Sequence, residues 1–409
     1  MCQNSRRFVD FVVCGARVLL TLVRLLAFVF LLMPGFIVFA WYYFVKADRI
    51  ALPYRDEAGL RHFMDLYGGR SGSRHVREEG GVDSNSAAAN TTTAISVPSP
   101  IAEEGRLKPV IIFLTGGGWI IGYKMWGALL ARALVPNGCL VAIPDYRNFP
   151  QVTVGEMISD VDEAVQWTLD NCQSFGGDPN RVVIVGQSAG AHLGSCILLR
   201  KALQEIGETP LRRPASRTTY RASDICGFVA ASGPYNLVSM SDSFHKHGLD
   251  NNIIYGIFSE NLERYSPIHL VKQIQEKQRR TKKGRHESGA TQVDVLPPFC
   301  IIHGTSDETV PYNGAVKYAN ALSGAGVRVK IHKYQKWSHT DPILEAPMSG
   351  NHRFHRDVHN FVRHWTTRLD TTLGGRKDAE LMPFDEAKPE CRPICPGPLI
   401  AAGRLLNPL

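Results

Sequence analysis

Short apolar runs rich in β-branched residues recur through most of the chain, and they restrict its possible folds more than any other feature. Their hydrophobicity is continuous rather than alternating, which is typical of strands buried on both faces of a sheet. Helical patterns lie between them, for example over residues 155–172 and 191–206. The alternation predicts the α/β class, with a doubly wound, mostly parallel sheet and helices on both faces. The six runs span residues 110–115, 140–146, 182–186, 227–233, 299–304 and 329–334.

One segment near the N-terminus is too long and too apolar to be such a strand. Residues 25–45 carry no charged side chain, and Lys46 follows them. About 20 apolar residues in a helix span a hydrocarbon core, and Trp41, Tyr42 and Tyr43 fall where an interfacial aromatic belt would lie. A cleaved signal peptide is the rival interpretation, but its apolar region is shorter and ends at small residues. We expect a single-pass transmembrane anchor over residues 25–45, and balanced flanking Lys and Arg leave its orientation open.

The net charge of +8 would suit a nucleic-acid partner if the basic residues covered a folded surface. They are instead concentrated before residue 25 and after residue 271, and the second stretch lacks interleaved aromatic residues. We therefore expect no nucleic-acid binding. The predicted organisation is a basic segment 1–24, the anchor 25–45, an α/β domain 50–368 with disordered insertions at about 68–107 and 272–295, and a disordered tail 369–409.

The nine cysteines are odd in number, scattered, and form no C-x-x-C pair. Several lie in apolar runs, as Cys300 does. This distribution predicts buried free thiols rather than a disulfide framework or a zinc site. No metal site is expected.

A possible nucleophile lies in Gly186-Gln187-Ser188-Ala189-Gly190, which follows one apolar run and precedes a helical pattern. G-x-S-x-G between a strand and a helix is typical of a nucleophile elbow. Side chains two positions before and after the serine would collide in so sharp a turn, which explains both glycines. We predict that Ser188 is the nucleophile. The simpler alternative is a serine that caps an ordinary helix.

Three consecutive glycines, Gly116, Gly117 and Gly118, follow an earlier apolar run. A carbonyl attacked by serine becomes an oxyanion, and glycines let backbone N–H groups approach and stabilise it. We predict that Gly117, Gly118 and Ala189 supply these donors, and we place Gly116 and Gln187 in the same oxyanion and substrate-binding region. A flexible glycine loop is the alternative, but the elbow downstream favours the oxyanion site.

A serine nucleophile needs a base, and the base needs an orienting carboxylate. In α/β-hydrolases the chain order is Ser…Asp…His, with the last two on loops after late strands. Asp307 and His339 follow the last two apolar runs. Glu308 is a rival for the acid, but Asp307 lies nearer the strand end. We predict a Ser188–His339–Asp307 triad that needs no metal or organic cofactor.

The remaining histidines are predicted to have structural or solvated positions. His303 and His332 fall within predicted strands and are interpreted as core or edge residues. Those in the last helical pattern are predicted to be solvated: His352, His355, His359 and His364.

Several motifs resemble the isoprenylcysteine α-carbonyl methylesterases, which are membrane-associated α/β-hydrolases. They include TGGGWIIGYKMWG (115–127), DYRNFPQVTVGEMISDV (145–161), FGGDPNRVVIVGQSAGAH (175–192) and HGTSDETVP (303–311). GQSAG, GGGW and HGTSD are shared with many esterases, whereas IIGYK, DYRNFP and FHKHGL are more selective. The likeness runs from about residue 65 to about residue 365, interrupted by the two insertions.

The resemblance implies the α/β-hydrolase fold and a serine carboxylesterase with the same three residues. Its substrate would be the methyl ester of a prenylated cysteine or of a prenylated protein C-terminus, and its location endoplasmic reticulum and Golgi membranes. A general esterase for lipophilic substrates and an aryl-formamidase are alternatives of the same fold. A non-catalytic ligand-binding homologue would be expected to have lost the serine or the histidine, and the sequence retains both. Oligomeric state is not predicted.

Overall fold

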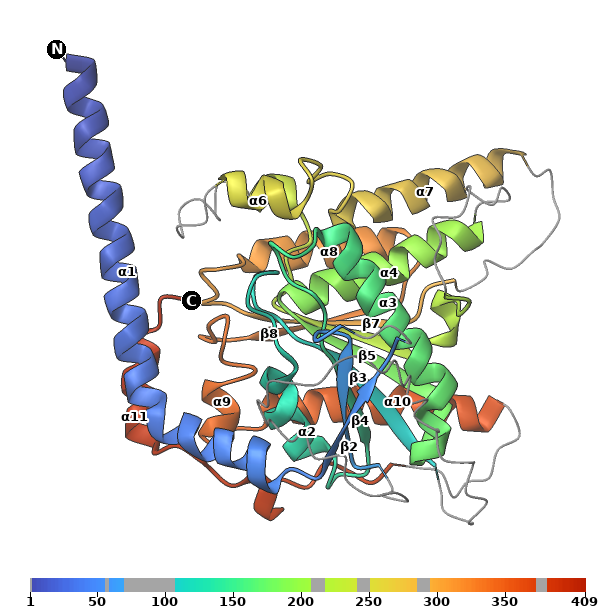
Figure 1. Cartoon of the computed structure of the whole chain (residues 1–409). Coiled ribbons are helices and arrows are strands. Elements are labelled where there is room, and N and C mark those ends of the chain that lie inside the picture. Colours follow the sequence, from blue (N-terminus) through green and yellow to red (C-terminus); the bar gives the residue numbers. More distant parts are fainter. Residues whose placement is uncertain are drawn as a thin grey trace, which may run out of the picture.

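The computed structural model describes residues 2–55, 59–69, 107–206, 218–240, 251–284, 295–372 and 381–409, and it contains one eight-stranded sheet (Figure 1). The strand order is β1-β2-β4-β3-β5-β6-β7-β8. The β1–β2 and β2–β4 pairs are antiparallel and all others are parallel. The predicted mostly parallel α/β fold is therefore confirmed.

All six predicted strands are present, and the sequence pattern missed only the first two strands of the sheet. In β2 the apolar run is interrupted by Asp65, which is fully buried and accepts hydrogen bonds from Tyr43 and Arg49. The strands are β1 (Arg49–Pro53), β2 (Phe63–Tyr67), β3 (Lys108–Leu114), β4 (Leu140–Pro144), β5 (Gly177–Gln187), β6 (Gly227–Ala231), β7 (Phe299–Gly304) and β8 (Val329–Tyr334).

Helices cover both faces of the sheet, as Figure 1 shows. Side chains of β3 alternate between two buried clusters, because successive strand residues point to opposite faces. One cluster includes α3 (Val154–Asn171), α4 (Ala189–Ile206), α6 (Asn251–Ile257), α7 (Pro267–Gly284) and α8 (Tyr312–Gly324). The other includes α2 (Ala128–Leu134), α9 (Glu345–Met348), α10 (Arg353–Thr372) and α11 (Gly397–Leu406).

The predicted anchor belongs to a long N-terminal helix, α1 (Cys2–Trp41), which continues into a short π-helical turn, Tyr42–Lys46. Within the described part of the chain, Leu19–Lys46 is the one helix long and apolar enough to cross a membrane. The basic segment 1–24 is part of the same helix rather than a separate unit.

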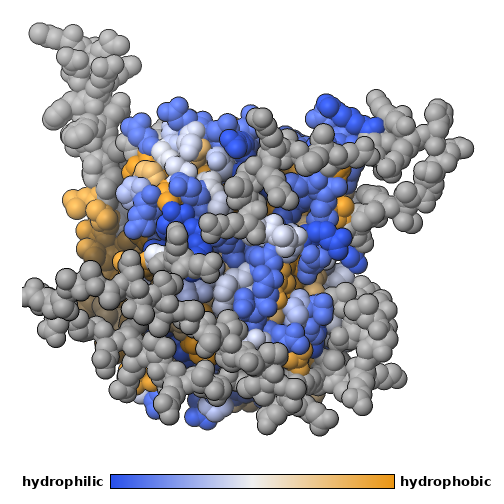
Figure 2. All heavy atoms as spheres, turned by 45° about the vertical axis from the view of Figure 1, so that its right-hand side comes forward, coloured by the Kyte–Doolittle hydropathy of each residue, from blue (hydrophilic) through white to orange (hydrophobic). Residues whose placement is uncertain are grey.

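This helix does not stand free of the rest of the protein. One face of the helix packs against the hydrolase domain. The buried residues on this face join the core around α2 and α10: Phe28, Leu32, Phe39 and Tyr43. The opposite face is an exposed apolar stripe, and the hydrophobic surface at the left edge of Figure 2 lies where this helix runs. We call it the α1 stripe: Leu26, Phe30, Met33, Ile37, Trp41 and Phe44.

The prediction of a disordered tail over residues 369–409 is wrong wherever the structure describes the tail. Residues 369–372 end α10, and α11 packs beside α1 (Figure 1). A Cβ at Gly403 would meet Leu32 Cδ1, so the two helices lie in close contact. The proline and glycine content of the tail suggested disorder, but several of its apolar residues, such as Leu381 and Ile400, are buried in the core. Residues 373–380 lie outside the described residues.

The prediction of a disordered basic insertion at 272–295 is also wrong over residues 272–284, which belong to α7. This helix buries Leu270, Val271 and Ile274, and its basic residues occupy the remaining faces. The many charged residues suggested disorder, but the few apolar residues form one short face that packs the helix against the core. Residues 285–294, and residues 70–106 of the insertion at about 68–107, lie outside the described residues.

The histidines of α10 are not solvated as predicted, except for His364, which is exposed. His352 Nε2 donates to the Cys391 carbonyl (2.9 Å), so its Nδ1 accepts the hydrogen bond from His355 Nδ1 (2.9 Å). His359 Nε2 donates to the Asn137 carbonyl (3.1 Å). The periodicity of α10 is amphipathic, but His355 and His359 lie on its buried face, where His352 Nδ1 and the Asn137 carbonyl accept their hydrogen bonds.

We expect the protein to lose stability as the pH falls below about 6.5, the ordinary histidine pKa. Burial, the neighbouring His352 and Arg132 hold the pKa of His355 well below that value, and burial lowers the pKa of His352. The unfolded chain binds these protons first, which removes about 1.4 kcal/mol per histidine for each pH unit. The unfolding temperature in detergent should be measured at pH 7.5 and at pH 5.5. The difference between the two temperatures should be smaller in His355→Gln than in the wild type. The exposed His364→Gln control should keep the full difference, and identical differences in all three proteins would contradict the prediction.

Candidate active site

Ser188 lies at the turn between β5 and α4, as predicted from the G-x-S-x-G pattern. Its φ of 52° is a left-handed value that is rare for a residue with a side chain. A Cβ at Gly186 would lie 2.6 Å from the Gly190 carbonyl oxygen, and one at Gly190 would collide with the Leu114 carbonyl. Both glycines are therefore required, and the strained turn lifts the Ser188 hydroxyl above the carboxyl end of the sheet.

The structure brings His339 and Asp307 to this hydroxyl from the loops after β8 and β7. His339 Nδ1 donates to Asp307 Oδ2 at 2.9 Å, because a carboxylate can only accept here. His339 Nε2 is therefore the unprotonated nitrogen, and it accepts the hydrogen bond from Ser188 Oγ at 2.8 Å. This is the tautomer that a general base requires. Glu308, the rival acid, is exposed.

The Asp307 carboxylate accepts two hydrogen bonds and lies beside a second imidazole. Oδ1 accepts the Val310 N–H at 2.7 Å, and Oδ2 accepts His339 Nδ1 at 2.9 Å. His303 Nε2, which donates to the Val310 carbonyl at 2.7 Å, lies 3.2 Å from Oδ2. Burial raises the pKa of Asp307, but the two imidazoles outweigh burial and lower it to about 2. The carboxylate therefore stays ionised throughout the neutral range. His303 was correctly interpreted as a core histidine, but its contact with Asp307 was missed. The signal was its position four residues before the acid, at the end of β7.

Hydrogen bonds between the acid loop and the base loop fix their separation. Thr305 N–H donates to the Tyr334 carbonyl and Ser306 N–H to the Trp337 carbonyl. Gln187 Nε2 donates to the His339 carbonyl at 3.3 Å, and Gln187 is almost fully buried. Gln187 was predicted to lie in the oxyanion and substrate-binding region. Its side chain lies against Gly116 of the glycine loop and also links the elbow to the base loop.

The glycine loop after β3 approaches the elbow closely. A Cβ at Gly116 would lie 3.0 Å from Ser188 Cβ, whereas one at Gly118 would meet nothing within 4 Å. Gly117 and Gly118 have φ values of 130° and 58°, which a residue with a side chain rarely adopts. Ala189 begins α4, so its N–H lies at the positive end of that helix dipole. These placements suit the predicted oxyanion donors.

The DYRNFP segment supports the glycine loop from behind. Tyr146 Oη donates to the Thr115 carbonyl at 2.9 Å, and Asn148 Nδ2 donates to the Gly122 carbonyl at 2.9 Å. Arg61 donates to the carbonyls of Gly122 and Tyr146. The loop is thus tied at both ends to one buried segment.

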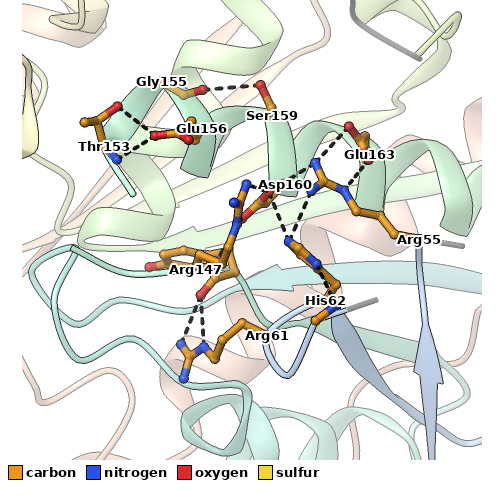
Figure 3. Close-up of polar contacts among 12 residues, drawn as sticks. Arg55, Arg61, His62, Arg147, Thr153, Gly155, Glu156, Ser159, Asp160 and Glu163 are labelled. Carbon is orange, nitrogen blue, oxygen red and sulfur yellow. Dashed lines mark hydrogen bonds and ion pairs between the residues drawn. The ribbon is translucent and has the colours of Figure 1, made fainter. Parts of the chain in front are cut away.

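That segment is in turn fixed to α3 by a buried ion-pair cluster (Figure 3). Arg147 binds Asp160 through both carboxylate oxygens, at 2.9 and 2.7 Å. Arg55 pairs with Asp160 and Glu163, and His62 Nε2 lies 3.4 Å from Asp160. Asp160 is fully buried, and these partners compensate for removing its charge from water.

Behind the glycine loop, Trp119 Nε1 donates to His192 Nδ1 at 3.3 Å. His192 Nε2 carries the proton, since it donates to the Tyr265 carbonyl at 2.8 Å. Burial lowers the pKa of His192 to about 4, so it stays neutral and keeps this tautomer. The His192 contact therefore orients the tryptophan that follows the glycines.

No group of three or more His, Cys, Asp or Glu that could hold a metal occurs among the described residues. The seven cysteines whose side chains are described are free and buried, as predicted. A serine, a correctly tautomeric imidazole, a fixed carboxylate and nearby glycine N–H groups can together perform acyl transfer.

Comparisons with known proteins show the class of the fold and the family of the chain. Esterase B from Lactobacillus Rhamnosis has the same fold, with a TM-score of 0.57 at 15% identity over 81% of this chain and 90% of that one. The fold therefore defines an α/β-hydrolase, and its sequence relatives are carboxylic-ester hydrolases. A family model described as BD-FAE matches residues 96–322.

Two plant proteins identify the family more closely. The probable isoprenylcysteine alpha-carbonyl methylesterase ICMEL1 of Oryza sativa subsp. japonica is 34% identical over 339 residues, covering 82% of this chain and 67% of the relative. Isoprenylcysteine alpha-carbonyl methylesterase ICME of Arabidopsis thaliana is 34% identical over 340 residues, with the same coverage. The chain belongs to the isoprenylcysteine alpha-carbonyl methylesterase family.

Proposed function

We propose that this esterase hydrolyses the methyl ester of a C-terminal isoprenylcysteine, with Ser188, His339 and Asp307 as its catalytic triad. The observation that carries the proposal is the continuous hydrogen-bond chain from Ser188 Oγ through His339 to Asp307. It occurs in a chain whose relatives are named for this ester.

In the first half-reaction, Ser188 Oγ attacks the ester carbonyl carbon while His339 Nε2 takes its proton. The carbonyl oxygen becomes an oxyanion that accepts hydrogen bonds from the N–H groups of Gly117, Gly118 and Ala189. Asp307 stabilises the imidazolium. His339 then gives its proton to the departing methoxy oxygen, so methanol leaves and an acyl-enzyme remains.

In the second half-reaction, water replaces methanol. His339 removes a proton from the water, the hydroxide attacks the acyl carbon, and the proton returns to Ser188 Oγ. The products are the free prenylcysteine carboxylate and the regenerated enzyme. Each step needs one proton transfer, and His339 serves as base and acid in turn.

The anchor fits a substrate of this kind. A prenyl chain partitions into a bilayer, and Leu19–Lys46 has the length and composition to enter one. The α1 stripe presents apolar side chains away from the protein, where lipid would cover them. We include in the proposal a single-pass N-terminal anchor at endoplasmic reticulum and Golgi membranes.

The substrate proposal is tested with three esters or amides. We expect the full-length protein in detergent to cleave farnesylcysteine methyl ester with a higher kcat/KM than a short-chain aryl ester or an aryl formamide. Hydrolysis should be measured as release of methanol from the farnesyl ester, phenol from the aryl ester and arylamine from the formamide, with Ser188→Ala as the blank. Cleavage of the aryl ester without the farnesyl ester would overturn the prenylcysteine assignment and leave a general esterase. A preference for the formamide would favour the formamidase.

A further inference from the structure

The end of α11 and the residues after it reach the loop that carries His339, although Arg404 and Asp341 lie 63 residues apart in the sequence. Arg404 Nε and a terminal guanidinium nitrogen lie 2.8 and 2.7 Å from Asp341 Oδ1. The other oxygen of Asp341 accepts the Ser338 N–H at 2.8 Å. Arg404 therefore holds the carboxylate that closes the turn around His339.

Asn407 contacts the same loop on both sides of His339. Its Oδ1 accepts the Leu409 N–H at 2.9 Å, which directs Nδ2 toward the loop. Nδ2 lies 3.2 Å from Ser338 Oγ, 2.8 Å from Thr340 Oγ1 and 2.6 Å from Glu345 Oε1. The residues immediately before and after His339 are thus bound to one amide group.

The backbone of this segment also joins the two catalytic loops. The His339 N–H donates to the Leu409 carbonyl at 3.2 Å, and Thr309 Oγ1 donates to the same oxygen at 3.3 Å. Thr309 lies two residues after Asp307. The segment therefore spans the gap between the acid loop and the base loop.

The contacts join partly exposed donors to buried acceptors: the Arg404 side chain is 37% exposed, Asn407 is half-buried, and the carboxylates they bind are buried. Asp341 and Glu345 are almost fully buried and lie close enough to repel one another. Burial and the charge of Asp341 raise the pKa of Glu345 to about 7, whereas its bonds to Thr340 and Asn407 lower it. If Arg404 and Asn407 were replaced, the buried carboxyl groups of Asp341 and Glu345 would lie beside the His339 loop without the guanidinium and the amide that now bind them.

The opposite side of α11 rests on α1. Gly403 touches Leu32, and Arg24 donates to the Asn407 carbonyl at 3.4 Å. The same short helix thus contacts the apolar N-terminal helix on one side and the base loop on the other. Its register along α1 determines where Arg404 and Asn407 meet the loop.

We propose that Arg404 and Asn407 are positioning residues that hold the His339 loop in place. Through α11, they connect the packing position of α1 to the alignment of the catalytic base. The proposal rests on the proposed role of His339. It assigns a function to a segment whose composition suggested disorder.

The test measures Ser188 activation in the full-length protein, in detergent. A fluorophosphonate probe labels Ser188 at a rate that depends on how strongly the base activates its hydroxyl. A soluble aryl ester gives kcat and KM. Asn407→Ala should lower kcat and the labelling rate together by roughly tenfold or more, because misplacement by about 1 Å costs up to about 100-fold. KM for the aryl ester should not change. Arg404→Gln should lower the rate similarly, and Arg404→Lys should restore part of it.

The final labelled fraction separates positioning from folding, since only folded sites react. In Asn407→Ala the rate per labelled site should fall while the labelled fraction remains that of the wild type. Leu405→Ala, a control on the same helix whose side chain is 81% exposed, should leave both values unchanged. An unchanged rate per labelled site in both Asn407→Ala and Arg404→Gln would overturn the proposal, whether or not the labelled fraction falls. Failure to label the wild type would instead overturn the triad, and failure on prenylcysteine esters alone would overturn only the substrate.

Discussion

The Ser188→Ala variant is expected to lose ester hydrolysis by a factor on the order of 10⁵–10⁶ in kcat. The variant removes the only atom that can form the acyl-enzyme, while the glycine N–H groups remain to give a small residual rate. The backbone should keep its conformation because alanine meets the same steric limit at a φ of 52° as serine does. Hydrolysis of farnesylcysteine methyl ester and of an aryl ester should be followed at saturating substrate.

Two controls make the Ser188 result decisive. Ser159→Ala, on the exposed side of α3, should have wild-type kcat, because its hydroxyl only bonds the Gly155 carbonyl of its own helix. The Ser188→Ala protein should unfold at nearly the wild-type temperature. Retention of substantial activity by a folded Ser188→Ala variant would exclude the acyl-enzyme mechanism.

The Asp307→Asn variant is expected to lower kcat by about 10⁴-fold. Both hydrogen bonds to this carboxylate come from N–H donors, the Val310 N–H and His339 Nδ1, and the His303 imidazole lies beside it. An asparagine must turn its NH₂ group toward one of these donors. If that donor is His339, the imidazole changes tautomer, Nε2 becomes protonated, and it can no longer take the proton of Ser188.

The matched variant for Asp307 is Glu308→Gln, which changes the adjacent rival acid. Glu308 is exposed, so we expect its replacement to leave kcat unchanged. Pre-steady-state measurement with an aryl ester should show that Asp307→Asn slows acylation itself. A large loss of kcat in Glu308→Gln, together with a small loss in Asp307→Asn, would show that Glu308 and not Asp307 orients His339.

The parts of this site that the sequence could predict are those in which local geometry dictates residue type. Gly186 and Gly190 flank Ser188 because any side chain there would strike backbone. Asp307 and His339 were recognisable because each follows a buried strand, and the carboxyl ends of parallel strands share one edge of the sheet. These constraints act over a few residues, so they remain visible in a single sequence.

The features that were missed depend on partners distant in the chain. Asp65 interrupts the pattern of β2 but accepts hydrogen bonds from Tyr43 and Arg49, and His352 is buried where it donates to the Cys391 carbonyl. The tail looked disordered because it has few apolar residues, yet several of them, such as Leu381 and Ile400, are buried in the core. β8 also differs from its predicted burial on both faces, because it is an edge strand with several exposed side chains. Long-range contacts of this kind leave no periodic signal.

The packing of α1 along the side of the hydrolase has a kinetic consequence if this helix enters a bilayer. A catalytic domain on a flexible tether would sample a volume above the membrane, but the contacts of Phe28, Leu32 and Phe39 hold this domain at a fixed height and rotation. Encounters would then arise from lateral diffusion of esters within the same membrane. We expect the rate to follow the mole fraction of prenylated ester among the lipids, and to fall on surface dilution at constant total concentration.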